Sequence, residues 1–330
     1  MADKLNWGIL ATGNIARQFA GGLNRSKTGR LVATGSRTEE SAKSFAEKHG
    51  GKPYGSYEEV LSDPEVQAVY IALPHHMHFD WTIRCAQAGK AILCEKPFTL
   101  NAFEAKRALN EVRANKVFFM EAFMYRCHPQ TLKVKELVDS GAIGEVLAIS
   151  SEFGFAASKD WTNFRADGTL GGGGLMDVGT YCVSFSRLVA GEEPAAAHYA
   201  AVINDRGYDE IGGGCLRFPK GIVAYFGTGV HVNLRNDATI YGSDGLIHVP
   251  NPWKCAQGGM TVQRGGKEVE RFDLKSTNDE LYAIEADTVA QFLDAKECPY
   301  MTVDDTLNNM RSLDSLRASA GLKFGMEQTE

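Results

Sequence analysis

The sequence predicts an α/β protein in which an N-terminal Rossmann domain, a doubly wound parallel sheet, precedes an α+β domain with a large, open and mostly antiparallel sheet. Apolar runs alternate with helical patterns through the first third of the chain, and a small-residue turn follows the first run. Most later strand-like runs have no helix between them. At 330 residues the chain is long enough for two domains, since single cores stop growing at roughly 250 to 300 residues. We expect domains at 1–127 and 128–330.

The first domain follows from five apolar runs separated by helical patterns. We predict strands at 5–10, 31–34, 66–73, 91–94 and 117–120, and helices over 15–23, 38–49, after Ser56, 79–88 and 102–115. Gly50 and Gly89 end two of these helices, and Ser56 and Glu59 have the spacing of a capping box. Runs that are apolar throughout are buried on both faces, which is typical of a parallel sheet covered by helices.

The second domain begins with a helix over 129–139, which has Pro129 at its start and Gly141 just past its end. Strand-like runs follow at 146–155, 200–204, 214–218, 222–226, 238–241, 246–249, 260–263 and 269–274, with helices at 175–189, 280–296 and 303–322. Consecutive strands without intervening helices predict an antiparallel sheet. Because helices on one face leave the other uncovered, we expect a partner subunit there, in a homodimer or higher homo-oligomer.

The composition is that of an ordinary globular protein, with 44% hydrophobic and 23% charged residues. The net charge of −6 and the lack of a Lys/Arg block argue against nucleic acid as a partner and favour small molecules. Seven scattered cysteines without close zinc-ligand spacing predict reduced thiols in a cytoplasmic protein and no metal site. We find no signal segment and no apolar run of membrane length, so we expect no membrane association.

A strand, a turn and a helix meet at residues 5–23. In a dinucleotide-binding turn, small residues allow the tight turn, the approach of the pyrophosphate and the packing of helix on strand. The helix N-terminus then offers free N–H groups and a partial positive charge to the phosphates. Ala11, Gly13 and Ala16 hold the three small-residue places here, and Thr12, Asn14 and Ile15 complete the predicted cofactor turn. The alternative is a plain strand-to-helix connection, because Ala11 replaces the first glycine.

The end of the second apolar run indicates which dinucleotide binds. About twenty residues past the turn, an acidic residue would hold the ribose of NAD. The chain has Ser36, Arg37 and Thr38 there instead. A guanidinium fork between hydroxyls suits a 2′-phosphate, so we predict NADP as the cofactor. Glu39 and Glu40 follow closely and leave NAD possible, and a solvated arginine is the alternative to a ligand.

Ligands bind beyond the carboxyl ends of parallel strands, so residues just after the apolar runs are candidates. After the third run, we expect Leu73, Pro74, His75 and His78 to line the cofactor pocket, with His78 best placed at a helix start. Three histidines among residues 75–78 invite a metal site, but no carboxylate or cysteine accompanies them at ligand spacing.

Glu95 and Lys96 follow the next buried strand, directly before Pro97, and we expect both at the cofactor. At the nicotinamide end, the Lys96 ammonium could polarise a carbonyl or stabilise an alkoxide. The alternative is a Glu–Lys ion pair that closes the edge of the sheet.

Asp177 and Tyr181 are four residues apart in a predicted helix, so both project from one face just after the glycines at 171–174. Glycines permit close backbone approach, and a nearby ammonium, which Lys96 could supply, favours the phenolate of a tyrosine. We expect Lys96, Tyr181 and Asp177 to be the catalytic residues. A core tyrosine bonded to a helical aspartate would give the same pattern.

Together these residues make the chain similar to the Gfo/Idh/MocA oxidoreductase family over essentially its whole length. The resemblance rests on the turn at 8–16, on Glu95-Lys96-Pro97, and on the runs at 120–126 and 172–181. Many members carry histidine at the place of Tyr181. Tyrosine makes the chain more similar to the branch of dimeric dihydrodiol dehydrogenase and D-xylose dehydrogenase, which uses NADP.

The resemblance implies hydride transfer in which Lys96 and Tyr181 handle the substrate hydroxyl and Asp177 orients a sugar or diol. It also implies a cis peptide before Pro97, cofactor contacts from Arg165, and dimers through the open C-terminal sheet. We therefore expect an NADP-dependent oxidoreductase of a secondary alcohol on a sugar or vicinal diol. Nicotinamide-dependent glycoside hydrolysis and non-catalytic NADPH sensing are the alternatives. The residues expected to line the substrate pocket are Tyr125, Arg126 and Trp161.

Overall fold

The computed structural model describes residues 4–329, which fall into two compact units. Residues up to 99, 103–127 and 276–306 form the first unit, and residues 100–102, 128–275 and those from 307 onward form the second. The expected linear division into 1–127 and 128–330 differs from these units chiefly at 276–306, which return to the first unit. A helix of this returning segment packs on the first helix of the chain, which explains its place.

The first unit is built on a six-stranded parallel sheet with strand order β3-β2-β1-β4-β5-β6. This is the order of a doubly wound dinucleotide-binding sheet, which confirms the predicted Rossmann architecture and puts the switch point between β1 and β4. Its strands are β1 (Leu5–Leu10), β2 (Gly29–Gly35), β3 (Lys52–Tyr54), β4 (Ala68–Ile71), β5 (Ala91–Glu95) and β6 (Phe119–Ala122). Its helices are α1 (Asn14–Arg25), α2 (Glu39–His49), α3 (Tyr57–Ser62), α4 (His78–Gln87), α5 (Ala102–Asn115) and α8 (Asn278–Phe292).

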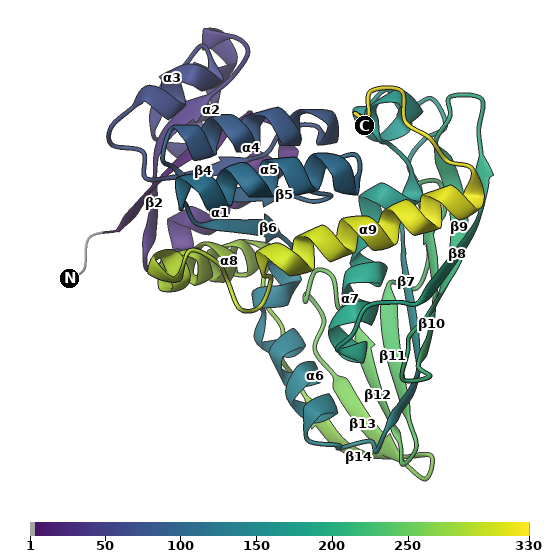
Figure 1. Cartoon of the computed structure of the whole chain (residues 1–330). Helices are drawn as coiled ribbons and strands as arrows, with labels where there is room; N and C mark the ends of the chain where they lie inside the picture. The colour runs from purple at the N-terminus through teal and green to yellow at the C-terminus, as the bar shows by residue number, and fades with distance from the viewer. Residues whose placement is uncertain (1–3, 330) are drawn as a thin grey trace. The chain divides into compact units, whose positions relative to one another are not determined.

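Aromatic rings fill the space between β1, β4 and α1. Trp7 meets Phe19 edge-on with ring centroids 5.1 Å apart, and Phe19 stacks on Tyr70 at 4.0 Å. On its other side, α1 contacts α8 (Figure 1). The two helices lie so close together that a Cβ on Gly22 would collide with the Cβ of Tyr282. Gly22 thus permits the close approach of two helices that are far apart in the sequence.

The second unit is built on an eight-stranded sheet with order β14-β13-β12-β11-β7-β10-β9-β8, in which only the β7–β10 pair is parallel. The predicted mostly antiparallel sheet is therefore confirmed. Its strands are β7 (Val146–Gly154), β8 (Ala196–Ile203), β9 (Asp209–Arg217), β10 (Val223–Gly229), β11 (Asp237–Gly242), β12 (Leu246–Pro250), β13 (Met260–Arg264) and β14 (Lys267–Phe272). Its helices are α6 (Pro129–Asp139), a π-helix (Leu175–Gly179), α7 (Thr180–Ala190) and most of α9 (Val303–Ala320).

The two faces of this sheet differ. In β10, Ala224 and Phe226 are buried, whereas Val223 and Tyr225 are exposed. α6 and α7 lie on the same side of the sheet (Figure 1), and the Ser319 hydroxyl of α9 accepts a hydrogen bond from the N–H of Tyr199 on edge strand β8 at 2.8 Å. Among residues 4–329, the opposite face carries exposed apolar side chains.

Residues 175–189, predicted as one α-helix, begin instead as a π-helix. The start of this π-helix is hydrogen-bonded to β10, since the Thr228 hydroxyl donates to the carbonyl of Gly174 at 2.8 Å. Its end also lies close to β10, where a Cβ on Gly179 would come within 3.2 Å of Thr228. π-turns of this kind are frequent at functional sites.

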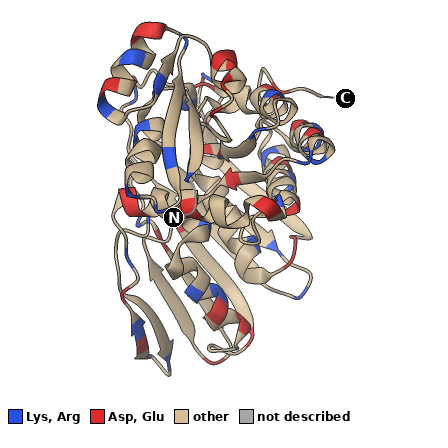
Figure 2. Ribbon diagram, turned by 90° about the vertical axis from the view of Figure 1, so that its left-hand side faces the viewer, with Lys and Arg blue, Asp and Glu red and all other residues tan. Residues whose placement is uncertain are grey.

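Basic and acidic residues are interspersed along the ribbon rather than separated by sign (Figure 2). On α2, for example, Lys43 and Glu39 form an ion pair of 2.7 Å. Within residues 4–329, no helix combines the length and apolarity needed to cross a bilayer.

Candidate active site

The turn after β1 leaves the N-terminus of α1 open. Gly13 is the N-cap residue, and no side chain caps the helix. A Cβ on Gly13 would meet nothing within 4 Å, and Thr12, Asn14 and Ile15 beside it are partly or fully exposed. Ala11 has a φ of +101°, which L-residues rarely adopt. The chain therefore keeps the glycine conformation of a dinucleotide turn with an alanine, at a strain of about 1–2 kcal/mol.

Arg37 is exposed just beyond β2, and no ion pair of the described residues engages it. Its neighbours have local partners. Ser36 is buried, and the Thr38 hydroxyl caps α2 by accepting from the N–H of Ser41 at 3.3 Å. Glu39 pairs with Lys43 along α2. This arrangement favours Arg37, rather than Glu39, as the residue that meets the ribose end of a dinucleotide.

His78, expected to line the cofactor pocket, is completely buried at the start of α4. Its Nδ1 lies 3.0 Å from the carbonyl oxygen of Pro97, and its Nε2 lies 2.8 Å from that of Leu73. Burial lowers the pKa of His78 to about 4, so the neutral ring donates to one of these carbonyls at a time. His78 thus links the chain after β4 to the Pro97 turn. His75 before it is buried as well, in the short helix that follows Pro74.

Lys96 follows β5, and its peptide bond to Pro97 is cis, as the family resemblance implies. Both Glu95 and Lys96 are buried, each 8% exposed. The Tyr70 hydroxyl donates a hydrogen bond to the Glu95 carboxylate, which ties this carboxylate to β4. Beyond the turn, the N–H of Phe98 donates to the Glu121 carboxylate at 3.0 Å. These contacts tie the residues on both sides of Lys96 to the neighbouring strands β4 and β6.

Tyr125 and Arg126, predicted at the substrate pocket, lie in a 3₁₀ turn over Met124–Cys127. Both are buried. Arg126 forms an ion pair with Asp305, which belongs to the same unit. The Tyr125 ring meets Phe123 edge-on at 6.0 Å. Within the first unit, these two side chains therefore have structural partners.

In the second unit, the structure brings Asp177 and Arg165 together. The Nε of Arg165 donates to Oδ1 of Asp177 at 2.9 Å, and its guanidinium lies 4.5 Å from the centre of the Phe164 ring. Arg165, implied as a cofactor contact, is thus partnered by a predicted catalytic carboxylate. Tyr181 lies one turn further on, and its buried ring meets Phe153 edge-on at 5.2 Å.

A buried carboxylate that the sequence did not reveal stands behind this group. Oδ2 of Asp209 accepts hydrogen bonds from the N–H of Leu175 at 2.7 Å and from the hydroxyl of Tyr199 at 2.6 Å. Burial raises the pKa of Asp209 to about 6. Asp209 and Tyr199 lie on β9 and β8, and no local motif marks them.

Trp161 lies in the loop after β7, where it is partly buried and meets Phe155 edge-on at 5.8 Å. Its carbonyl accepts a hydrogen bond from Arg206 at 3.1 Å. The loop that bears this predicted substrate residue is therefore tied to the turn before β9.

The first unit fits a dinucleotide. The open helix N-terminus lies beside the switch point of the sheet, where doubly wound folds bind pyrophosphate. Gly13 leaves room for close approach, and Arg37 offers an exposed cation beyond the next strand.

Similar proteins agree with this geometry. The description "Oxidoreductase family, NAD-binding Rossmann fold" matches residues 5–123, and "GFO/IDH/MocA C-terminal domain" matches residues 131–248. Over 338 residues the chain is 33% identical to a trans-1,2-dihydrobenzene-1,2-diol dehydrogenase from Xenopus tropicalis, an alignment that covers 98% of this chain and 100% of the relative.

Two solved structures are similar over nearly their whole length, since each alignment covers 96% of this chain and 98% of the other protein. One is an aldose–aldose oxidoreductase from Caulobacter crescentus complexed with glycerol, with a TM-score of 0.88 and 26% identity. The other is a 3-ketoreductase from Actinomadura kijaniata in complex with NADP and TDP-benzene, with a TM-score of 0.85 and 28% identity. With both halves matched and the predicted dinucleotide turn in place, the chain belongs to the Gfo/Idh/MocA family of NAD(P)-dependent oxidoreductases.

Proposed function

We propose that the protein is an NADP(H)-dependent oxidoreductase that interconverts a secondary alcohol and a ketone on a sugar or vicinal diol. The observation that carries this proposal is the Arg165–Asp177 pair one turn before Tyr181. A buried carboxylate, a guanidinium and a phenol offer hydrogen bonds to several hydroxyls of one substrate. The names of the relatives, a diol dehydrogenase, an aldose–aldose oxidoreductase and a 3-ketoreductase, support the same substrate class.

The residues divide the work as follows. A bound nicotinamide would supply or take up the hydride exchanged with the substrate carbon. Tyr181 moves the proton of the reacting hydroxyl, and the Lys96 ammonium stabilises the negative charge on that oxygen. Asp177, oriented by Arg165, accepts a hydrogen bond from a second hydroxyl. Trp161, Tyr125 and Arg126 stay predictions for the border of the substrate site.

NADP is the proposed cofactor because Arg37 is exposed and unpaired at the place where NAD-specific sheets carry a carboxylate. The turn from Ala11 to Ile15 would hold the pyrophosphate through backbone N–H groups at the start of α1. A guanidinium can bind a 2′-phosphate through two parallel hydrogen bonds.

The test is a panel of sugars, polyols and diols with NADP⁺, and of the matching ketones with NADPH, followed at 340 nm. Tyr181→Phe should lower kcat about a hundredfold to ten-thousandfold on the best substrate and leave the KM for NADPH unchanged. Tyr300→Phe, a partly buried tyrosine of the first unit, serves as the control. Unchanged turnover in Tyr181→Phe would contradict the role of the phenol.

Two other outcomes would contradict the proposal as a whole. Sugar release without net change in cofactor absorbance would indicate glycoside hydrolysis. Tight NADPH binding without turnover of any compound in the panel would indicate a sensor.

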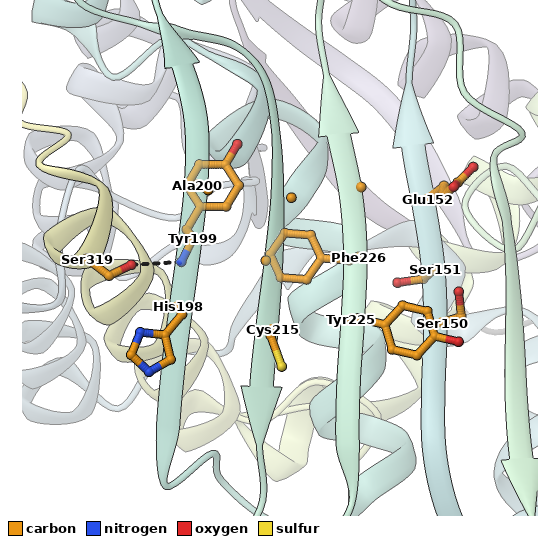
Figure 3. A pocket seen from close by; sticks show the side chains of 13 residues that line it. Ser150, Ser151, Glu152, His198, Tyr199, Ala200, Cys215, Tyr225, Phe226 and Ser319 are labelled. Atoms are coloured by element: carbon orange, nitrogen blue, oxygen red, sulfur yellow. Dashed lines mark hydrogen bonds between the residues drawn. The ribbon is translucent and has the colours of Figure 1, made fainter.

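We further propose that the protein forms homodimers through the open face of the second sheet. Val223, Tyr225 and Tyr241 are exposed there by 38%, 47% and 37%. Tyr225 lies in register with Cys215 and Ser150 of its neighbouring strands, and Figure 3 shows these three side chains. Together with Gly213 and Gly227 they line a hollow of about 590 Å³. An apolar patch of this kind is typical of an interface, and an isologous partner would present an aromatic knob to each hollow.

Light scattering after size exclusion tests the dimer. Tyr225→Glu should give a monomer, whereas Met326→Glu, a change at an exposed apolar residue of the C-terminal tail, should leave the dimer intact. A dimeric Tyr225→Glu variant would place the interface elsewhere.

The cysteines bear on where the protein is located. All seven are free thiols, which supports a reducing compartment such as the cytoplasm as the location of the protein.

A further inference from the structure

The Asp209 carboxylate has no part in the proposed reaction, yet it is completely buried at the start of β9, behind the segment that carries Asp177 and Tyr181. No ion pair of the described residues neutralises it. Burying a carboxylate without a counter-charge is costly, so its place behind this segment needs an explanation.

Its contacts converge on the start of the π-helix. Oδ2 accepts from the N–H of Leu175, the first residue of the π-helix, at 2.7 Å. The same oxygen accepts from the Tyr199 hydroxyl at 2.6 Å. Oδ1 has no hydrogen-bond partner within the part of the chain that the structure describes. One oxygen thus holds both donors, and the other faces the glycine run.

Gly173 and Gly174 pack directly against this carboxylate. Gly173 has a φ of +111°, and a Cβ there would collide with Oδ1 of Asp209. A Cβ on Gly174 would lie 3.2 Å from Oδ2 and 3.0 Å from the Cα of Gly229. The carboxylate therefore occupies the volume that side chains at 173 and 174 would need, so the backbone can pass this close to it only with glycine at both positions.

From this point, two hydrogen bonds lead to the proposed site. The N–H of Asp177 donates to the carbonyl of Gly173 at 3.0 Å, and the N–H of Gly173 donates to the carbonyl of Arg165 at 2.8 Å. The side chains of Arg165 and Asp177 then meet at 2.9 Å. Anchoring Gly173 and Leu175 consequently sets the positions of Asp177 and Arg165, and of Tyr181 one turn later.

We propose that Asp209 is a positioning residue that, with Tyr199, holds the 173–181 segment in the geometry needed for catalysis. This inference rests on the proposed function of Asp177 and Tyr181. It assigns Asp209 no contact with substrate or cofactor.

The first test is Asp209→Asn in the full chain, with Asp205→Asn as the matched control, since Asp205 is exposed in the turn just before β9. Weakening the two hydrogen bonds at Oδ2 should lower kcat at least tenfold and leave the KM for NADPH within twofold, because the cofactor residues belong to the other unit. Hydrogen–deuterium exchange should become faster over residues 171–181 and stay unchanged over residues 11–16. Asp205→Asn should match the wild type in all three measurements.

Tyr199→Phe is the second test, which removes one donor and keeps the carboxylate. Its effect on kcat should be smaller than that of Asp209→Asn, and the double variant should lose less than the product of the two single effects, because both act through one oxygen. This cycle also tests the inference if Asp209→Asn does not fold, since Tyr199→Phe alone should then speed exchange over 171–181.

Asp209→Asn with wild-type kcat and wild-type exchange over 171–181 would overturn the inference. A wild-type enzyme that turns over no sugar or diol would instead overturn the proposed function. In that case the exchange measurement still decides whether Asp209 holds the segment.

Discussion

The buried Asp209 carboxylate should make the stability of the second unit depend on pH in a defined direction. Burial raises its pKa from 3.8 to about 6, with the hydrogen bonds from Tyr199 and Leu175 acting in the opposite direction. Below pH 3.8 the group is protonated in both the folded and unfolded states and has no net effect on stability. As the pH rises from 3.8 to about 6, the carboxyl ionises in the unfolded chain before it does so in the folded protein, and stability falls until both states are charged. The full difference is about 3 kcal/mol, at 1.36 kcal/mol for each pKa unit.

Asp209→Asn cannot titrate, so it isolates this contribution. About half of this loss, between 1 and 2 kcal/mol, occurs between pH 5 and pH 8. The free energy of unfolding of the wild type, minus that of Asp209→Asn, should decrease by this amount over the interval. Tyr199 is the titratable side chain that faces the carboxylate, and burial raises the pKa of its phenol far above this range.

Urea unfolding at several pH values between 5 and 8 measures the difference. Fluorescence of Trp253, which is buried in the second unit and stacked on Phe153 at 5.7 Å, reports on this unit. Three Trp→Phe substitutions at the remaining tryptophans would isolate that signal in both variants. Exposed Asp205→Asn should show the same pH dependence as the wild type. A difference between wild type and Asp209→Asn that stays constant from pH 5 to pH 8 would refute the reasoning.

Two further predictions concern the first unit. Arg37→Ala should raise the KM for NADPH at least tenfold and leave the KM for NADH within twofold, since it removes the cation proposed to bind the 2′-phosphate. Arg30→Ala, at another exposed arginine, is the control. Equal effects of Arg37→Ala on both cofactors would contradict the assignment. Ala11→Gly should relieve the strain at φ +101° and raise Tm by about 2 °C. Ala88→Gly, at an unstrained φ of −79°, should not raise Tm. A lower Tm for Ala11→Gly would show that the turn is unstrained.

Most of the fold could be predicted because its signals are local. Continuous apolar runs such as the one before Ala11 marked the parallel strands, and Ser56 with Glu59 forms the capping box that its spacing predicted. β9 was the harder case. Its middle contains Gly212–Gly214, which carry no side-chain pattern. Gly212 leaves room for the ring of Tyr199, and Gly214 leaves room for that of Phe226.

From the sequence, candidate site residues could be proposed only within single segments. Spacing alone defined the turn at 11–15 and the pair of Asp177 and Tyr181, and their roles stay predictions. The partner of Arg126 is Asp305, far along the chain, so no spacing could show that this arginine is already engaged. His78 was expected to line the cofactor pocket, and nothing in the sequence indicated that each of its ring nitrogens lies against a backbone carbonyl. Asp209 was missed because its donors come from two other segments.

The return of α8 to the first unit affects how the protein is made. Tyr282 covers Gly22, and Asp287 accepts hydrogen bonds from Ser26 and Thr28, so the helix supplies contacts that nothing before residue 276 replaces. During synthesis, the nucleotide unit is begun first but completes its packing only when residues 276–306 have emerged from the ribosome. A truncated product that ends near residue 127 would leave the α8-facing side of α1 in water.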